Sequence, residues 1–221
     1  MGDLVTRSLR RVDLPVTGGP FTIPEVKSLI SEQYGHLYSI VVKAGLRYFE
    51  ADPPQTITAS GLVSYPLPDD HDCTIGIDRV VDSAGRTDQL DELMIQERNA
   101  YAGAVGDAYY YSVVGQSIVL FPTPSSGTYL HLYVPQAPDI SALNDTDEVD
   151  VVTADGEAFL IYGVAAKLCA KTEVDPRLVT SERDAAEGRF IVDVGMRAIV
   201  NPRRRIVRPT PLDEYYYEGW W

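Results

Sequence analysis

The chain has 221 residues, 45% of them hydrophobic, which suits one large domain or two closely packed halves and excludes a chain that is disordered throughout. Its 32 Asp and Glu residues outnumber 19 Lys and Arg residues, and the formal net charge of -13 argues against a sequence-specific DNA-binding protein, because phosphate binding depends on cationic contacts. Two cysteines, Cys73 and Cys169, are too few for a disulfide scaffold and are expected to be reduced thiols, and no run approaches the ~18 apolar residues of a membrane span.

Residues 22–54 predict the longest helix. Thr22 and Glu25 match a T-x-x-E capping box, Pro24 lies in the first turn, and Pro53-Pro54 would end the helix. Apolar residues recur between these signals at spacings of three and four, which predicts one buried stripe: Val26, Ile30, Tyr34, Leu37, Val41, Ala44 and Tyr48.

From residue 55 to about 139 the sequence predicts β-strands. "QTITASGLVSYPLP" alternates around Gly61 as a hairpin would, and "CTIGIDRVVDSAGR" predicts a strand that ends in a turn. "AYYYSVVGQSIVLFPTPSSGTYLHLYVPQAP" contains three β-rich runs separated by Gly115 and a Pro-Ser-Ser-Gly turn, which predicts a meander. Between these stretches, residues 87–107 predict one short helix followed by a loop.

Two more helices are predicted after an acidic connection, "ISALNDTDEVDVVTADG". "DGEAFLIYGVAAKLCAKTEVD" is apolar on all sides and rich in small residues, which indicates a buried helix. Asp175 and Pro176 would cap and open the last helix, which runs to Pro202.

These elements predict an α+β fold, in which an antiparallel helical bundle carries an inserted antiparallel β meander or sandwich and an extended C-terminal arm. The expected organisation is an N-terminal segment (1–21), a helical core (22–54 and 151–200), a β-rich insertion (55–150) and the arm (201–221).

Two polar motifs resemble metal sites only in composition. "DDHDC", residues 69–73, places adjacent side chains that would point to opposite faces of a strand, and no second cluster supplies further ligands; we interpret it as a polar turn that leads into a strand at Thr74. "NDTDEVD", residues 144–150, lacks the Gly and Glu that a calcium loop requires at its sixth and twelfth positions. We interpret it as a solvated loop that caps the next helix, and we expect no metal site.

No catalytic template is present in the sequence. His36, His71 and His131 lie on three different predicted elements, and there is no nucleophile elbow, phosphate-binding loop or dinucleotide-binding glycine motif. We therefore expect a protein that is not an enzyme, with no catalytic residue and no cofactor. A hydrolase built on a pair of carboxylates stays open as an alternative, because carboxylates are plentiful.

The last segment, "NPRRRIVRPTPLDEYYYEGWW", combines basic, proline and aromatic residues. Its prolines forbid a continuous helix, and an extended segment of this length spans up to about 65 Å. Its five aromatic side chains have about 750–1250 Å² to bury, comparable with one side of a standard protein interface. Burial on the chain's own core stays open, but Tyr, Trp and Arg are the residues enriched in binding hot spots. We therefore expect these residues to bind another subunit: Arg203, Arg204, Arg205, Arg208, Tyr215, Tyr216, Tyr217, Trp220 and Trp221.

Several stretches, in chain order, resemble the adaptor (head-to-tail connector, or neck) proteins of tailed bacteriophages. An N-terminal helix is followed by "YPLPDD" and "IDRVV", then by "YYYSVVGQSIVLFPTPSSGTYLHLYVPQAP", and then by "DGEAFLIYGVAAKLCAKTEVDP". The most telling part is the strand pair Tyr111–Phe121 with its Gly115 turn and "LFPTP" exit, and the resemblance covers roughly residues 22–200. "DDHDC" and the aromatic end depart from the pattern.

The resemblance implies a structural virion protein at the head–tail interface, assembled in the host bacterial cytoplasm. Such a protein forms a homo-oligomeric ring, of twelve copies, beneath the portal protein and joins it to the next tail or neck protein. DNA would pass through the lumen without sequence-specific binding, as the acidic composition also suggests. In such proteins the C-terminal extension commonly reaches the portal, so the arm has the portal or a neighbouring subunit as its expected partner, and no membrane is involved.

A second class of function is a β-rich module that binds carbohydrate through Tyr109, Tyr110 and Tyr111. Three consecutive strand residues cannot all share one face, which weakens this alternative.

Overall fold

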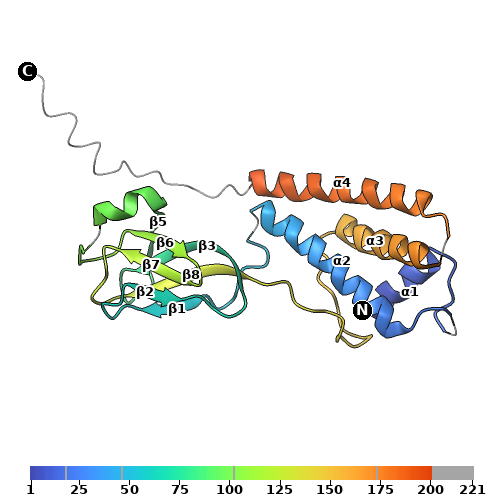
Figure 1. Cartoon of the computed structure of the whole chain (residues 1–221), viewed down its shortest axis with the longest axis horizontal. Helices are drawn as coiled ribbons and strands as arrows, with labels where there is room; N and C mark the ends of the chain where they lie inside the picture. The colour runs from blue at the N-terminus through green and yellow to red at the C-terminus, as the bar shows by residue number, and fades with distance from the viewer. Residues whose placement is uncertain (18, 46, 102, 173, 201–221) are drawn as a thin grey trace, which may run out of the picture.

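The computed structural model describes residues 1–17, 19–45, 47–101, 103–172 and 174–200, without the side chains of 95, 96 and 198–200. Helices gather at one end of an elongated molecule and two β-sheets lie at the other, so the α+β class is confirmed (Figure 1). The nine predicted interface residues of the arm lie outside the described residues.

The bundle consists of four described helices: α1 (Gly2–Arg10), α2 (Ile23–Lys43), α3 (Ala154–Thr172) and α4 (Arg177–Val200). The predicted capping box of α2 is present, because Thr22 Oγ1 accepts from Glu25 N and the Glu25 carboxylate accepts from Thr22 N at 2.7 Å. The predicted end near Pro53 is wrong, since α2 ends at Lys43. Gly45 follows two residues later with φ of 75°, a left-handed conformation that ends many helices and that glycine adopts without strain.

Helix α1 was not predicted, because nine residues give too few turns for a period to be evident. Its side chains Leu4, Val5 and Leu9 are buried against α2 and α3. The N-terminal segment therefore contributes to the helical core instead of only preceding it.

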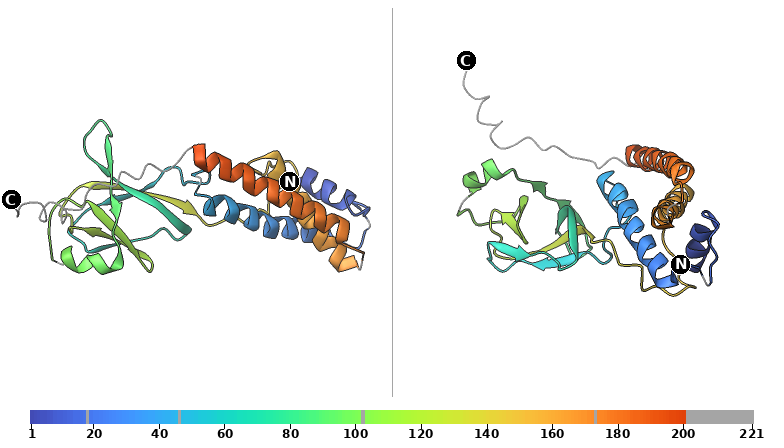
Figure 2. Two further views of the ribbon diagram at one scale, coloured as in Figure 1. Left: turned by 90° about the horizontal axis from the view of Figure 1, so that it is seen from above. Right: turned by 45° about the vertical axis from the view of Figure 1, so that its right-hand side comes forward.

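Helix α3 lies between α2 and α4, and its small residues permit this close packing (Figure 2). A Cβ added at Gly163 would overlap the side chain of buried Gln33 in α2. The predicted start of α4 is confirmed, because Asp175 Oδ1 accepts a hydrogen bond of 3.0 Å from Arg177 N. α4 packs mainly against α3 and forms an outer edge of the bundle.

Within the described residues, eight strands form two four-stranded sheets. One sheet has the order β1-β8-β3-β4 and the other β2-β7-β6-β5, and every pair is antiparallel except β5 with β6. A 3₁₀ helix, η1 (Ile95–Tyr101), follows β5 and is the predicted short helix. The strand bounds are β1 (Gln55–Thr58), β2 (Ser64–Pro66), β3 (His71–Val80), β4 (Thr87–Gln89), β5 (Asp91–Glu92), β6 (Tyr110–Val114), β7 (Ser117–Phe121) and β8 (Thr128–Pro135).

Two predicted strand pairings are wrong. The stretch around Gly61 is not a hairpin, because β1 pairs with β8 and β2 pairs with β7 in the other sheet. β6 and β7 do form the predicted hairpin at Gly115, but β8 crosses to the first sheet, so the three strands are not a meander. Leu120 of β7 and Tyr129 of β8 thereby belong to one core formed by both sheets, and burial of that core outweighs pairing of neighbouring strands.

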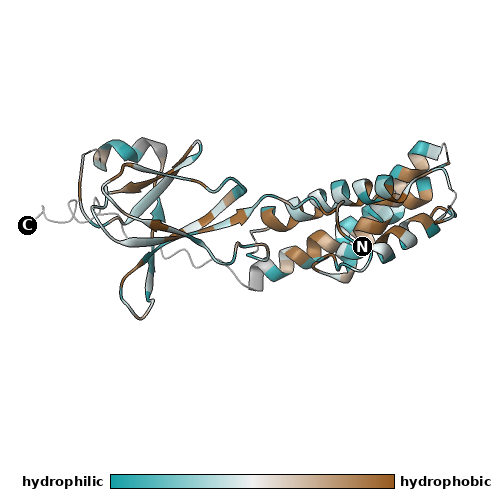
Figure 3. Cartoon of the chain, turned by 90° about the horizontal axis from the view of Figure 1, so that it is seen from below, coloured by the Kyte–Doolittle hydropathy of each residue, from teal (hydrophilic) through white to brown (hydrophobic). Residues whose placement is uncertain are grey.

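Strands β3 and β8 connect the sheets to the bundle. Ile75 and Val134 belong to the apolar cluster of the helices, and Tyr38 of α2 donates a hydrogen bond of 2.6 Å to the Pro135 carbonyl. Figure 3, coloured by hydropathy, shows apolar residues in both the helical and the β regions, in agreement with two buried clusters.

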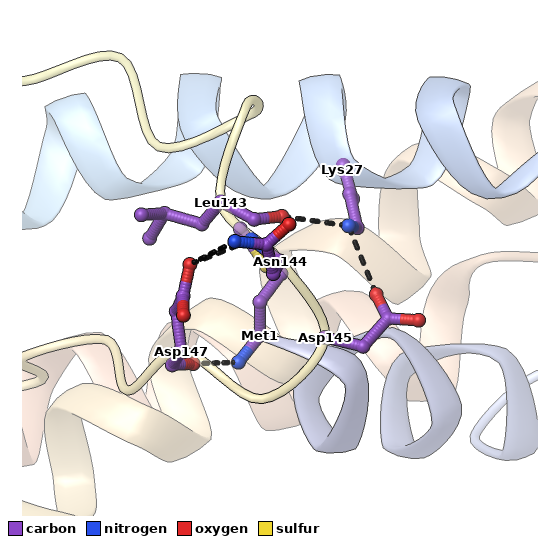
Figure 4. A network of polar contacts seen from close by, with 6 residues as sticks. All are labelled: Met1, Lys27, Leu143, Asn144, Asp145 and Asp147. Atoms are coloured by element: carbon purple, nitrogen blue, oxygen red, sulfur yellow. Dashed lines mark hydrogen bonds and ion pairs between the residues drawn. The ribbon is translucent and has the colours of Figure 1, made fainter.

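The acidic connection between β8 and α3 holds the start of the chain (Figure 4). Lys27 of α2 donates to the Leu143 carbonyl at 2.7 Å and lies 2.9 Å from Asp145 Oδ1, while the Met1 ammonium donates to the Asp147 carbonyl. The α3 cap comes instead from Thr153, whose hydroxyl accepts from Gly156 N at 3.1 Å, so the predicted capping role of residues 144–150 is wrong.

Candidate functional site

Helix α4 has an inward face that explains its place in the bundle. Ala186, Phe190 and Val194 recur every four residues and are fully buried. The Phe190 ring stacks on Phe159 of α3 with centroids 6.3 Å apart. This face alone would satisfy the packing of an ordinary amphipathic surface helix.

The opposite face of α4 carries a second stripe, which we call the outward strip. From Leu178 to Gly195 its members are spaced alternately by three and four residues, and Met196 lies four residues after Val192. The members contain no charged side chain and leave large apolar groups in solvent, with Leu178 75%, Val192 64% and Met196 59% exposed. A repeat of this kind is the pattern of a helix that packs against another helix along a narrow seam. The outward strip consists of Leu178, Ser181, Ala185, Gly188, Val192, Gly195 and Met196.

Two glycines in the outward strip have no explanation in the part of the chain that the structure describes. A Cβ added at Gly188 or at Gly195 would meet no atom within 4 Å. Glycine inside a helix costs about 1 kcal/mol relative to alanine, so two of them weaken α4 without relieving any contact in the described chain. A backbone from another molecule that approaches α4 closely would account for both.

The charges next to the outward strip are largely paired within the chain. Arg189 lies 3.0 Å from Asp155 of α3, and Arg183 lies 2.6 Å from Asp184. Such exposed pairs add little stability, but they leave few free charges to hinder an apolar contact along the seam. The surface is therefore suited to a helix and unsuited to a phosphate or a metal ion.

The outward strip and the predicted arm are adjacent in the chain. Every arm residue predicted to bind a partner lies in 201–221, and this segment follows α4 directly after Val200. α4 ends at the junction between the bundle and the sheets (Figure 1). The sequence predicted only the arm, because α4 has apolar residues on both faces and their spacing does not show which stripe packs on α3.

The three consecutive tyrosines do not form a binding platform. Tyr111 is buried between the sheets, Tyr109 lies just before β6 and is 52% exposed, and Tyr110 packs on Tyr101 with ring centroids 5.2 Å apart. The alternation of β6 separates Tyr110 from Tyr111, as predicted, and burial removes Tyr111 from the surface, so this geometry does not support the carbohydrate-binding alternative.

Two histidines meet in the first sheet beside Tyr133, and they form a hydrogen-bonded chain. His131 is fully buried, and because the Gln55 amide oxygen can only accept, His131 Nδ1 donates to it at 2.9 Å. The Thr74 hydroxyl lies 3.0 Å from His131 Nε2 and 2.9 Å from His71 Nε2. His71 therefore lies inside β3, and the predicted turn is limited to Asp69 and Asp70.

The His131 cluster predicts a loss of stability in mild acid. Burial, and then the neighbouring His71, lower the pKa of His131 from 6.5 to about 4. The His131 imidazole therefore binds a proton more tightly in the unfolded chain than in the folded chain, and protonation of the unfolded chain begins near pH 6.5. Between pH 7 and pH 5 this one group should reduce the free energy of unfolding by about 2 kcal/mol. Urea unfolding at both pH values should show a smaller pH effect in His131→Gln than in wild type; equal pH effects would contradict this role.

No group of three or more His, Cys, Asp or Glu residues in the described ranges is arranged to hold a metal ion. Within the same ranges, no helix combines the length and the apolar character needed to cross a bilayer.

The sequence matches the model of one protein family, described as SU10 adaptor protein, over residues 1–210. A search of curated proteins finds no match. The match includes all four helices, both sheets and the arginines of the arm, and stops before its aromatic end. The chain therefore belongs to the SU10 adaptor protein family, a family of phage adaptor proteins.

Proposed function

We propose that this protein is the adaptor ring that connects the portal to the tail of the virion and lines the channel through which DNA passes. The observation that carries the proposal is the outward strip, a charge-free seam on an outer helix of a phage adaptor protein. A ring requires that each subunit presents one face to a different face of its neighbour, and the outward strip is suited to be one of these two faces.

The outward strip alone is too short to hold two subunits together, so the proposed interface also needs the arm. Residues 178–196 cover about 27 Å of helix, which is less than most stable coiled coils need. The arm adds about 750–1250 Å² of aromatic surface, and together the two reach the size of a specific interface. We propose that its arginines and aromatic residues, at positions 203–208 and 215–221, bind the portal or a neighbouring subunit.

The charge distribution supports a channel through which DNA moves freely. The arm carries four arginines and three carboxylates, so residues 1–200 carry a net charge of -14. DNA that meets such a surface finds few cations to bind and releases few counterions. The proposed role needs no catalytic residue, cofactor or metal.

Native mass spectrometry of the full chain, alone and mixed with purified portal, tests the proposal. We expect a complex with a fixed number of copies per portal, twelve if the ring matches its relatives. A chain without residues 201–221 should fold but should no longer join the portal. Particles that assemble normally with the truncated chain would contradict the role given to the arm.

A glycine substitution separates folding from assembly. Gly188→Ala should raise the free energy of unfolding by about 0.5–1 kcal/mol, because its methyl group meets no atom of the described chain. The same variant should assemble less well, because the methyl group keeps a neighbouring backbone away from the seam. Thermal unfolding and portal binding measured on one preparation check both effects, and a gain in stability with unchanged binding would argue against a close contact at Gly188.

A further inference from the structure

The β region contains a groove that no step of the proposed ring uses. It has a volume of about 410 Å³ and lies between β4, β5, η1 and β6. Tyr101, Tyr109, Tyr110 and Pro122 supply its apolar walls, and Asp88 and Asp91 supply carboxylates. This combination of tyrosines and acidic side chains in one groove is suited to a ligand that has flat apolar surface and positive charge.

The groove already binds one guanidinium of its own chain. The Arg79 guanidinium lies 5.6 Å from the centroid of the Tyr109 ring, and its Nη1 is 2.8 Å from Asp107 Oδ2. Asp88 is 4.0 Å from Arg79, and Asp91 is half-buried on the same wall. The charged residues that line the groove are Arg79, Asp88 and Asp91, with a net charge of -1, and Arg79 is already paired with Asp107, so the groove favours a second cation.

The chain itself contains a segment with complementary chemistry. Residues 202–211 read "PRRRIVRPTP", with three prolines and four arginines. Proline fixes its backbone near the polyproline II conformation, and ligands in this conformation characteristically dock into grooves lined by aromatic side chains. Arginines beside the prolines would pair with the acidic wall.

We propose that residues 202–211 of this protein dock into the groove formed by β4, β5, η1 and β6. The inference rests on the proposed role of the arm as a binding segment, but not on the ring. Val200 and Pro209 are nine residue steps apart, which at the rise of a polyproline II helix would span about 28 Å, and α4 ends on the side of the bundle that faces the sheets (Figure 1). The family match contains the groove and nearly all of this segment, whereas the aromatic end lies beyond it and is left free for another partner.

Disulfide trapping in the full chain tests the docking. Gln89, exposed in β4 on the groove wall, and Thr210 in the segment are replaced by cysteine, and mild oxidation should link them. The matched control pairs Thr210→Cys with Thr58→Cys, which is also exposed but lies on β1, at the other edge of the same sheet. We expect about tenfold more linkage from position 89 than from position 58, with products assigned by mass spectrometry because Cys73 and Cys169 are present. Links between two chains support docking of the segment on a neighbouring subunit, whereas links only within one chain would place these arginines on their own chain and contradict their proposed binding to a partner.

Charge reversal tests the recognition chemistry. Asp88→Lys with Asp91→Lys should reduce the linkage about tenfold, and adding Arg205→Glu with Arg208→Glu should restore it. Asp69→Lys, an exposed carboxylate in another turn, should leave the linkage unchanged. Equal linkage at positions 58 and 89, or no response to charge reversal, would overturn the inference. If the chain still joins the portal in that case, the proposed function stands and only the docking site is wrong.

Discussion

Val192→Glu is expected to abolish assembly while leaving the fold intact. The Val192 side chain is 64% exposed in the single chain, so a glutamate there should change the free energy of unfolding by less than about 0.5 kcal/mol. In the proposed seam the same carboxylate would be buried without a partner, at a cost of about 3–5 kcal/mol for each interface, which weakens every contact in a ring by more than about a hundredfold. Portal binding by native mass spectrometry and thermal unfolding should be measured together.

The matched control is Val105→Glu, the same change at a valine that is 73% exposed in the β region. It should neither unfold the chain nor reduce portal binding. Equal losses of binding in both variants would mean that added negative charge, and not the outward strip, is responsible. Normal binding by Val192→Glu would remove the strip from the interface.

Gly156→Ala should have the largest effect on stability, a loss of about 3–4 kcal/mol in the free energy of unfolding. A methyl group at this position, in the first turn of α3, would overlap the Val151 carbonyl oxygen and would lie 3.1 Å from Phe190 Cε2 and 3.2 Å from Leu37 Cδ1. Relief would require the α3 start to move away from both α2 and α4, because a carbonyl oxygen cannot rotate aside like a side chain. Urea unfolding at neutral pH measures the loss.

Gly35→Ala in α2 is the control for this prediction. A Cβ at Gly35 would meet no atom within 4 Å, so alanine should stabilise the chain by about 0.5–1 kcal/mol through its helix propensity. Opposite signs at the two glycines would establish that close packing, and not glycine in general, decides the outcome. A loss below 1 kcal/mol for Gly156→Ala would contradict the packing described at the start of α3.

The sequence predicted a helix start correctly wherever a full capping signal was present. Thr22 with Glu25, and Asp175 with Pro176, mark real helix starts because a cap satisfies backbone groups within a few residues of itself. The end of α2 differs from the prediction because Gly45, in a left-handed conformation, ends the helix before the two prolines are reached. The short α1 is stabilised by burial of Leu4 and Leu9 in the bundle, which no local signal reports.

The sheets were the harder problem, because pairing between distant strands leaves no local trace. β1 and β2 are separated by five residues, yet they lie in different sheets, since each has a better partner near the other end of the β region. The β6–β7 hairpin was predictable because Gly115, with φ of 58°, supplies the left-handed turn residue.

The candidate site was only half visible from the sequence. Composition identified the arm, because Arg, Tyr and Trp stand out in a chain end whatever the fold. The outward strip was hidden, because α4 has apolar residues on both faces and only the packing on α3 shows which stripe is left over. The groove could not be predicted from the sequence either, because only the fold brings Asp88 of β4 and Tyr101 of η1 into the lining of one groove.

The central claim is that the outward strip is covered by another molecule in the assembled particle. Maleimide labelling of Ser181→Cys, compared between the free chain and assembled particles, tests it most directly, because Ser181 lies in the strip and is exposed in the single chain. Thr58→Cys on β1 serves as the reference, and each site is quantified by mass spectrometry. We predict that assembly slows labelling at position 181 at least about tenfold relative to position 58; equal rates at position 181 in the free chain and in particles would contradict the claim.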